Sequence, residues 1–279
     1  MSFKTLEITT QNHIAHVKLN RSDALNAMNI DFWQELPLAI REIDAAAEAR
    51  VIVISSTGKH FSAGMDLAVF TSGNAIPMGG DPSRMAENLR RAVLELQDAF
   101  NVLENARIPV LAAIQGGCIG GAVDMVCASD SRYCTEDTFF TIKETQLGMT
   151  ADLGTMQRLP KLIPEGIMRE LAYTGRKFDA AEAKEIGLVN KVFATQEEML
   201  EGVMSIAAAI AKQSPVAVTG CKEMINYSRD HSVADSLKYM ATWQSGMFRP
   251  QDMMKCFQAK ATKTDPDFEP LQPIKPLFT

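Results

Sequence analysis

The chain has 279 residues, a length that fits one large domain or one domain with an appendage. Apolar residues make up 46% of the chain and charged residues 22%, which is ordinary for a globular protein. The formal net charge of −6, without a block of Lys or Arg, argues against a protein that binds nucleic acid and leaves room only for a local basic spot that binds a small phosphate ligand.

The N-terminal part alternates between strand and helix patterns. Residues 6–9 and Ile14–Leu19 predict two strands around a turn, because apolar and polar side chains alternate in the second segment. Asn29 can cap a helix, in which we expect a kink or a late start at Pro37. The all-apolar run 51–54 predicts a strand that is covered on both faces.

The middle of the chain begins with a segment rich in glycine and proline, residues 71–85, which predicts a loop. A long helix should follow, with apolar side chains on one face: Leu89, Val93, Leu96, Phe100 and Leu103. The next expected elements are a buried strand, an apolar helix and two short strands, at Val110–Ile114, 122–128, 132–134 and Phe139–Thr141.

From Thr155 onward the pattern is mostly helical. The expected helices are 167–173, Ala180–Glu185, 197–211, 216–227, Val233–Met247 and 253–261, with one short strand at 189–193. Four prolines in the tail predict an extended chain end. The fold class is therefore α/β, with a core over residues 1–200 and a helical C-terminal part with an extended tail over residues 201–279.

The five cysteines and four histidines show no disulfide or metal-binding pattern. The cysteine count is odd and no C-x-x-C spacing occurs, so we interpret them as reduced thiols. The histidines form no ligand-spaced set, so we expect no metal site. No apolar run reaches the roughly 20 residues of a membrane span, and no targeting signal is seen, so we expect a cytoplasmic protein without a membrane span.

Two predicted strands lead into glycine-containing turns, at residues 61–66 and 116–121. In an open α/β sheet, ligands bind beyond the carboxyl ends of the strands. A helix that begins at such a turn offers unpaired N–H groups, which can polarise a carbonyl and hold the oxyanion that it becomes. Each turn also has a purely structural interpretation, as a tight loop that closes the sheet.

Three carboxylates are candidates for chemistry. Asp124 lies in an otherwise apolar helix, where a lone charge is costly unless it is paired or shares a proton. It is either a structural carboxylate near the start of the helix or an active-site group. Glu144 and Asp152 lie in a stretch punctuated by glycine, where the ordinary interpretation is surface charge. Composition does not decide between these alternatives.

Several motifs, in order and at consistent spacing, resemble the enoyl-CoA hydratase/isomerase (crotonase) superfamily. They are residues 61–66, 109–116, 120–124, 157–160, 174–176, 180–183 and 187–189. The resemblance covers about residues 6–261. It implies a crotonase-like fold, with ββα repeats in a spiral of parallel sheets and a helical C-terminal trimerisation part. It also implies an acyl-CoA thioester substrate, no metal or redox cofactor because coenzyme A is part of the substrate, and a homo-trimer or hexamer.

The resemblance also implies roles for individual residues. The backbone N–H groups of Met65 and Gly121 would form the oxyanion hole. The backbone near Ala63 would contact the adenine of coenzyme A. The residues expected to bind coenzyme A are Ala24, Ser62, Ala63, Gly64 and Asp66. Asp124 and Glu144 match the positions where hydratases carry paired glutamates, and Asp152 stands where hydratases usually carry a small residue.

The set Asp124, Glu144 and Asp152 resembles the Δ(3,5)-Δ(2,4)-dienoyl-CoA isomerase subfamily. That resemblance implies the conversion of 3,5-dienoyl-CoA to 2,4-dienoyl-CoA in fatty-acid β-oxidation, through an oxyanion-stabilised dienolate. Glu144 would be the base at C2, Asp152 the acid at C6, and Asp124 a hydrogen-bonding neighbour. One alternative is an enoyl-CoA hydratase, which has no use for Asp152. A second alternative is a non-catalytic homologue that binds RNA or a protein partner, against which the acidic charge argues.

Overall fold

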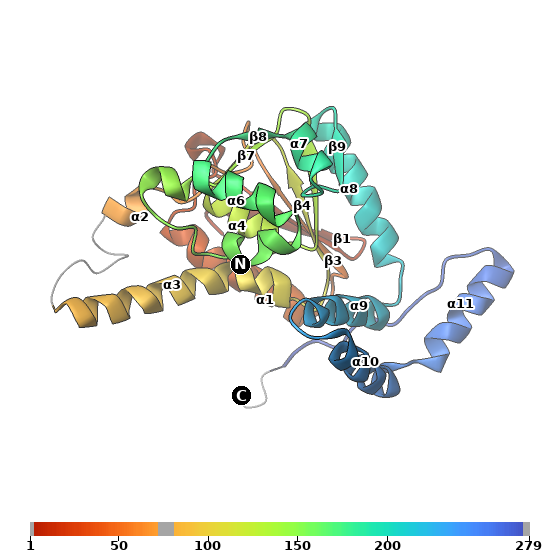
Figure 1. Ribbon diagram of the computed structural model, residues 1–279. Coiled ribbons are helices and arrows are strands. Elements are labelled where there is room, and N and C mark those ends of the chain that lie inside the picture. The colour runs from red at the N-terminus through yellow and green to blue at the C-terminus, as the bar shows by residue number, and fades with distance from the viewer. Residues whose placement is uncertain (1–2, 72–80, 276–279) are drawn as a thin grey trace.

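The computed structural model describes residues 3–71 and 81–275 (Figure 1). Its main sheet has the strand order β1-β2-β3-β4-β6-β9, in which β1 is antiparallel to β2 and every later pair is parallel. The strands are β1 (Leu6–Gln11), β2 (Ile14–Leu19), β3 (Val51–Ser56), β4 (Val110–Ile114), β6 (Ser131–Thr135) and β9 (Lys191–Phe193). Strands β3 and β4 are buried along their whole length, as their apolar runs predict.

A second sheet, with three strands, begins in the turn 116–121 that follows β4. It contains β5 (Gly117–Ile119), β7 (Phe139–Thr141) and β8 (Phe178–Asp179), in that order. Strand β5 is parallel to β7, and β7 is antiparallel to β8. The chain therefore passes from the first sheet into the second through Gln115 and Gly116. The Gln115 side chain donates to the carbonyl of Ser56, the last residue of β3, at 3.1 Å, so the turn 116–121 begins beside the end of β3.

Two long helices, α1 (Ile30–Ala46) and α3 (Pro82–Asn105), pack against each other, and Trp33 meets Phe100 with ring centroids 5.2 Å apart. The Asn29 side chain accepts a hydrogen bond from the Phe32 N–H, as predicted for a cap. The expectation of a late start at Pro37 is wrong, because α1 already begins at Ile30. Most of the predicted loop 71–85 lies outside the described residues; the short helix α2 (Ala68–Thr71) precedes that part and α3 follows it.

Short elements lie around the edge of the sheets. They are η1 (Ser22–Ala24), α4 (Gly121–Cys127), η2 (Glu144–Leu147), α5 (Thr155–Arg158), η3 (Leu159–Lys161), α6 (Glu165–Thr174) and α7 (Ala180–Glu185). Most of the candidate residues lie on these elements or on the turns beside them. Helix α4 is buried at all of its residues, as the apolar run 122–128 suggests.

Helix α8 (Gln196–Ala211) contains the predicted domain boundary after residue 200. Its buried face packs against β3, β4 and β6 through Met199, Val203, Ala207 and Ala211. The helix is therefore part of the α/β core. The C-terminal helical part begins after it and contains α9 (Pro215–Ser228), α10 (Val233–Met247) and α11 (Pro250–Thr262).

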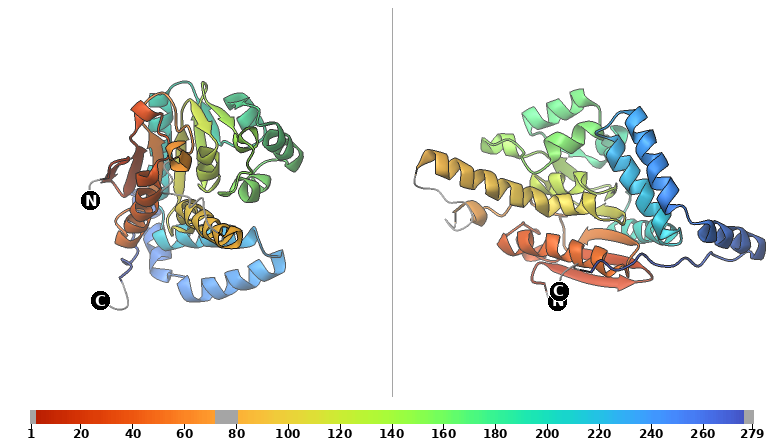
Figure 2. Two further views of the ribbon diagram at one scale, coloured as in Figure 1. Left: turned by 90° about the vertical axis from the view of Figure 1, so that its left-hand side faces the viewer. Right: turned by 90° about the horizontal axis from the view of Figure 1, so that it is seen from below.

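The C-terminal helices lie beside the core, and α11 projects from the side opposite the free end of α3 (Figures 1 and 2). The side chain of Lys222, on α9, is buried and donates to the carbonyl oxygens of Leu103 (2.9 Å) and Ile108 (3.0 Å). It also forms an ion pair with Asp130 at 2.9 Å. The extended tail returns to the core, where Arg50 donates to the Phe268 carbonyl at 2.7 Å. Within residues 3–71 and 81–275, no helix is both long and apolar enough to cross a bilayer.

Candidate active site

The two glycine turns lie side by side. Ser62 and Cys118 form a parallel bridge, in which the Ser62 N–H donates to the Gly117 carbonyl and the Ile119 N–H donates to the Ser62 carbonyl, each at 3.1 Å. The backbone of residues 62–65 therefore runs alongside residues 117–121. The structure thus brings together two segments that are more than fifty residues apart in the sequence.

Met65 is bridged to Met28 on its other side. The Met28 N–H donates to the Gly64 carbonyl at 2.8 Å, and the Asp66 N–H donates to the Met28 carbonyl at 3.1 Å. Met65 lies between the two residues that bond to Met28, and in a parallel pair the N–H of such a residue points away from the neighbouring strand. The Met65 N–H is therefore directed away from Met28 and toward the second turn.

Gly121 is the first residue of α4, so its N–H has no acceptor within the helix. A Cβ atom placed on Gly121 would lie 3.8 Å from the Met65 nitrogen, and one placed on Gly64 would lie 3.3 Å from the Gly121 nitrogen. Gly64 also has φ +82° and would bring its Cβ within 2.5 Å of the Ile119 carbonyl, so no side chain fits there. The two N–H groups are neighbours, as an oxyanion hole requires; that role stays a prediction.

Asp124 lies in the first turn of α4 and is only 1% exposed. Its Oδ1 accepts a hydrogen bond from the backbone N–H of Thr155 at 2.6 Å. Burial raises the pKa of this carboxyl from 3.8 to about 6, against the opposing effect of the Thr155 hydrogen bonds. The charge of Asp152 raises the pKa further, and the charge of Arg158 lowers it.

Glu144 begins η2 and faces the second glycine turn. Its Oε1 lies 3.0 Å from the position that a Cβ on Gly120 would occupy. Among the residues that the structure describes, none offers a hydrogen bond to its buried Oε2. Burial, followed by the charge of Asp124 and then by that of Asp152, raises the pKa of Glu144 from 4.5 to about 7.

Asp152 is more exposed than the other two carboxylates and lies between the buried residues Ala151 and Leu153. The atoms around it displace enough water to raise the pKa of its carboxyl above the ordinary value. Its charge also raises the pKa of Asp124 and of Glu144. The ionisation of Asp152 is therefore linked to the pKa values of the two more buried carboxyl groups.

The residues predicted to bind coenzyme A lie together, but Ser62 requires a correction. Its side chain is fully buried, donates to the Asn26 carbonyl at 2.8 Å and accepts from the Gly64 N–H at 3.1 Å. The Ser62 hydroxyl therefore shapes the turn and is not accessible to a ligand. The Ala63 N–H donates to the Leu25 carbonyl, which places this turn beside the segment that carries Ala24.

Asp66, also predicted to bind coenzyme A, is held by neighbouring groups. Its Oδ1 accepts from the Ala68 N–H at 3.1 Å, and its Oδ2 lies 3.5 Å from Arg21 Nη1. Because Ala24, Ala63 and Asp66 are partly exposed, they remain accessible for the predicted contact. The contact itself stays a prediction.

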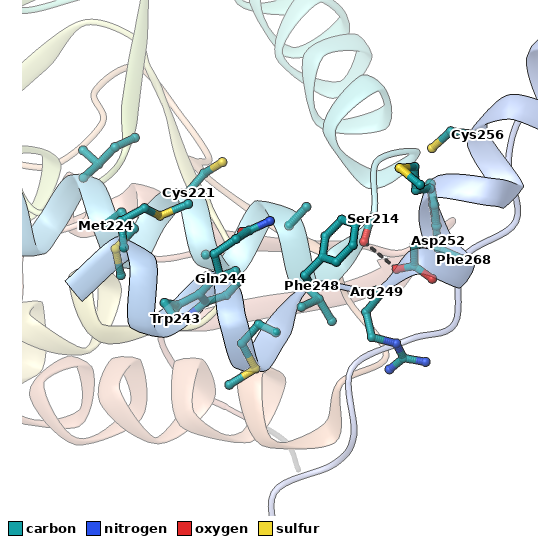
Figure 3. Close-up of a pocket in the computed structure, with 17 residues that line it drawn as sticks. Ser214, Cys221, Met224, Trp243, Gln244, Phe248, Arg249, Asp252, Cys256 and Phe268 are labelled. Atoms are coloured by element: carbon teal, nitrogen blue, oxygen red, sulfur yellow. Dashed lines mark hydrogen bonds between the residues drawn. The ribbon is translucent and has the colours of Figure 1, made fainter. Parts of the chain in front are cut away.

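Two cavities of about 550 Å³ each are relevant to the site. One is polar and lies between α3 and the segment that follows Asp152, where its lining includes Gln97, Leu153, Gly154 and Arg158 and none of the three carboxylates. The other is apolar and lies among α9, α10 and α11, where its lining includes Met224, Trp243 and Phe248 but none of the three carboxylates (Figure 3). Across residues 3–71 and 81–275, no group of three or more His, Cys, Asp or Glu side chains is arranged to hold a metal ion.

Three interactions of Asp124 and Asp152 were not predicted from the sequence. The Thr155 N–H binds Asp124, the Arg158 charge acts on the same carboxyl, and the Gln97 side chain donates to the Asp152 carbonyl at 2.6 Å. Gln157 and Arg158 carry part of the family resemblance, but no role was assigned to them. For Gln97 the sequence holds no signal, because a single polar residue on a helix has no pattern.

Comparison with known proteins agrees with this geometry. The Enoyl-CoA hydratase/isomerase family model matches residues 9–271. The mitochondrial Δ(3,5)-Δ(2,4)-dienoyl-CoA isomerase of Homo sapiens is 46% identical over 260 residues, which cover 92% of this chain and 79% of the human protein. The peroxisomal enzyme of the same name from Arabidopsis thaliana is 44% identical over 274 residues, which cover 97% of this chain and 99% of the plant protein.

Solved structures agree with the fold. The crystal structure of enoyl-CoA hydratase from Bacillus anthracis superposes with a TM-score of 0.85 at 30% identity and covers 95% of this chain and 99% of that chain. The α/β crotonase-like fold expected from the motifs is therefore confirmed. With a family model that spans most of its length and relatives of this similarity, the chain belongs to the enoyl-CoA hydratase/isomerase family.

Proposed function

We propose that this chain is a Δ(3,5)-Δ(2,4)-dienoyl-CoA isomerase. The observation that carries the proposal is the grouping of Asp124, Glu144 and Asp152 beside the N–H groups of Met65 and Gly121. The charge of Asp152 raises the pKa of both buried carboxyl groups, and the charge of Asp124 raises that of Glu144. Five relatives that bear this name are 44–47% identical to the chain over at least 92% of its length.

The reaction begins at C2 of a 3,5-dienoyl thioester. A proton at C2 is acidic because it is next to the carbonyl and is also allylic. Its removal leaves an electron pair that is spread over the thioester oxygen and along the chain to C6. The N–H groups of Met65 and Gly121 hold the charge on the oxygen, and donors already in place for such an oxyanion lower the barrier.

Two carboxyl groups then move the protons. Glu144 lies against Gly120, next to the paired N–H groups, so it is placed for the carbon beside the carbonyl, C2. A pKa of about 7 suits a general base at neutral pH. Glu144 takes the C2 proton, and the Asp152 carboxylic acid delivers one to C6. The electron pair then closes the 2,4-diene, and the two carboxyl groups exchange protonation states.

Asp124 supports this exchange without contacting solvent. Its buried charge raises the pKa of Glu144, so the proton that leaves the substrate finds an acceptor near neutrality. Its Thr155 hydrogen bond fixes one oxygen, and burial favours the protonated form of the other. This arrangement argues against the hydratase alternative, in which Asp124 and Glu144 would together hold an attacking water molecule and Asp152 would have no task.

The decisive experiment is the Asp152→Asn variant. The substitution removes a titrating group and keeps the shape of the side chain, so 3,5-dienoyl-CoA isomerisation should fall by roughly 10²–10⁴-fold, the usual contribution of a positioned acid or base. Glu144→Gln should lose a comparable factor, and the double variant should lose less than the product because the two groups act as one unit. The measurement is the absorbance of the conjugated 2,4-diene.

The control is Asp267→Asn, which makes the same change at an exposed carboxylate of the tail and should leave turnover unaltered. Hydration of a 2-enoyl-CoA is followed in parallel. Normal isomerisation by Asp152→Asn, or rapid hydration by the wild type without isomerisation, would refute the assignment. We propose that no metal or redox cofactor takes part, so a chelator should leave the rate unchanged.

We further propose that the chain forms a homo-trimer or hexamer through α9–α11. The support is the family resemblance together with the apolar cavity among these helices and the exposed side chains of Leu237, Met247 and Phe257 (Figure 3). Light scattering should show the assembly, and a stable monomer at micromolar concentration would contradict it. The cytoplasmic location stays a prediction, since similar proteins are named as mitochondrial or peroxisomal.

A further inference from the structure

Helix α3 contacts the segment that carries Asp152 along a single stripe. The stripe consists of Gln97, Asn101 and Glu104, which are four and three residues apart and so lie on one face of the helix. All three side chains hydrogen-bond to residues 152–158. The other face of the same turns packs into the core through Ala99, Phe100, Val102 and Leu103.

Gln97 holds the backbone of Asp152. Its Nε2 donates to the Asp152 carbonyl oxygen at 2.6 Å. Within residues 3–71 and 81–275, no side chain hydrogen-bonds to the Asp152 carboxylate, and its own backbone N–H is its hydrogen-bond donor, so the place of that carboxylate depends on how its backbone is held. Ala151 and Leu153 are buried on either side, but hydrophobic burial has no directional preference, so the Gln97 hydrogen bond supplies the directional restraint on the Asp152 carbonyl.

Arg158 fastens the other end of the segment to the same stripe. Its Nε and Nη2 donate to Glu104 Oε2 at 3.0 Å and 2.7 Å, and Nη2 also donates to Asn101 Oδ1 at 2.6 Å. The ion pair is mostly shielded from water, with the Arg158 side chain 12% exposed and that of Glu104 17% exposed. Two nitrogens of one planar guanidinium thus converge on a single carboxylate oxygen, in charge-assisted hydrogen bonds that are stronger than neutral ones.

Gly154 allows the segment to fold back between these two anchors. Its φ of +133° is unfavourable for any residue with a side chain, and a Cβ there would lie 2.0 Å from Arg158 Nη1. The turn at Gly154 then presents the Thr155 N–H to Asp124. One short segment thus carries Asp152, supports Asp124 and is fixed at both ends by α3.

We propose that the α3 stripe positions the proton-transfer groups, and that Gln97 is the positioning residue for Asp152. The inference rests on the proposed function, because it gives Asp152 the second proton transfer. A reacting group must stay within a fraction of an ångström of its productive place, and a misplacement of about 1 Å can cost on the order of 10²-fold in rate. Loss of the Gln97 bond frees the Asp152 peptide to rotate and displaces its carboxylate from C6.

The test uses two variants of the full-length protein. Gln97→Met has nearly the same shape and cannot donate, and Gln97→Glu places a carboxylate against the Asp152 carbonyl. Each should lower kcat for 3,5-dienoyl-CoA isomerisation by roughly 10-fold to 10²-fold, with KM within about twofold of the wild type. The thermal midpoint should stay within about 2 °C, since the side chain is at the surface of the helix. Asn88→Met, at an exposed amide of α3, is the matched control and should behave as the wild type.

A double-mutant cycle separates positioning from a general structural role. Asp152→Asn keeps the carbonyl that Gln97 binds but removes the carboxyl that it positions. If Gln97 acts through that carboxyl, Gln97→Met should have no further effect on the residual rate of Asp152→Asn. An unchanged kcat in Gln97→Met, or the same fold-loss in both backgrounds, overturns the inference while leaving the isomerase assignment in place. A wild type that does not isomerise dienoyl-CoA overturns the proposed function itself.

Discussion

Replacing Asp124 by Asn should make the protein more stable at neutral pH and leave its stability in acid unchanged. The carboxyl is 1% exposed and its pKa is raised from 3.8 to about 6, mainly by burial. Between these two values, the folded chain binds more protons at this position than the unfolded chain does. The free energy of unfolding of the wild type therefore falls as the pH rises through this range.

The size of the effect follows from the two pKa values. A difference of about two pH units corresponds to roughly 3 kcal/mol of unfolding free energy lost between about pH 4 and about pH 6. An Asn side chain keeps the oxygen that accepts the Thr155 N–H and carries no charge. The unfolding free energy of the variant should therefore not fall over this pH range through residue 124. Without the charge of Asp124, the raised pKa of Glu144 also moves back toward its ordinary value. This change further increases the stability of the variant relative to the wild type at neutral pH.

The measurement is urea unfolding of both proteins at a series of pH values from about 4 to about 7, at one protein concentration so that the proposed assembly would contribute equally to both. Asp267→Asn, an exposed carboxylate, serves as the control and should follow the wild type. Should the difference in unfolding free energy between Asp124→Asn and the wild type stay constant over this range, Asp124 is not a desolvated carboxyl and its role in raising the pKa of Glu144 is lost with it.

Three further outcomes test the site and its support. Gly121→Ala should fold, because the added methyl would lie 3.8 Å from the Met65 nitrogen, yet it should lower kcat by about 10²-fold by crowding the two donors; steady-state kinetics with unchanged circular dichroism checks this. The rate at low substrate should rise with pH through the pKa of about 7 of Glu144, because the base must be ionised, and a profile that is flat from about pH 5 to about pH 8 would exclude that role. Lys222→Met should cost about 2–3 kcal/mol in urea unfolding, since it leaves Asp130 without its partner and two buried carbonyl groups without a donor; a loss within error of zero would contradict this.

The bounds of an element were predictable where a clear side-chain pattern extends over its whole length. The strand Val110–Ile114 and the helix Val233–Met247 have the predicted bounds, because an apolar run and an amphipathic stripe each end at clear breakers. Strands β5 and β8 were missed, since three and two residues are too few to show an alternation. The packing of α8 was hidden for a different reason: an apolar helix face indicates that something covers it, but not that the cover is the sheet.

The sequence singles out candidate site residues but not the groups that hold them in place. Asp124 stood out because a carboxylate is rare in an apolar helix, and family motifs singled out Glu144 and Asp152. Backbone groups such as the Thr155 N–H carry no sequence signature, and the burial of Ser62 depends on a bond to a carbonyl thirty-six residues away. Polar contacts between distant segments depend on tertiary geometry, which a linear pattern does not contain.

The Glu104 carboxylate has a mechanical consequence. One oxygen binds Arg158 beside the catalytic segment, and the other forms an ion pair with Arg229, at the end of α9. The Glu104 carbonyl also accepts from Asn226 of α9. A tilt of α9 would pull on the same carboxylate that anchors Arg158, so α9 is mechanically linked to the segment that carries Asp152. Substitutions in α9 that shift this helix should therefore change turnover, although none of the hydrogen bonds that its side chains form within the described part of the chain goes to Asp124, Glu144 or Asp152.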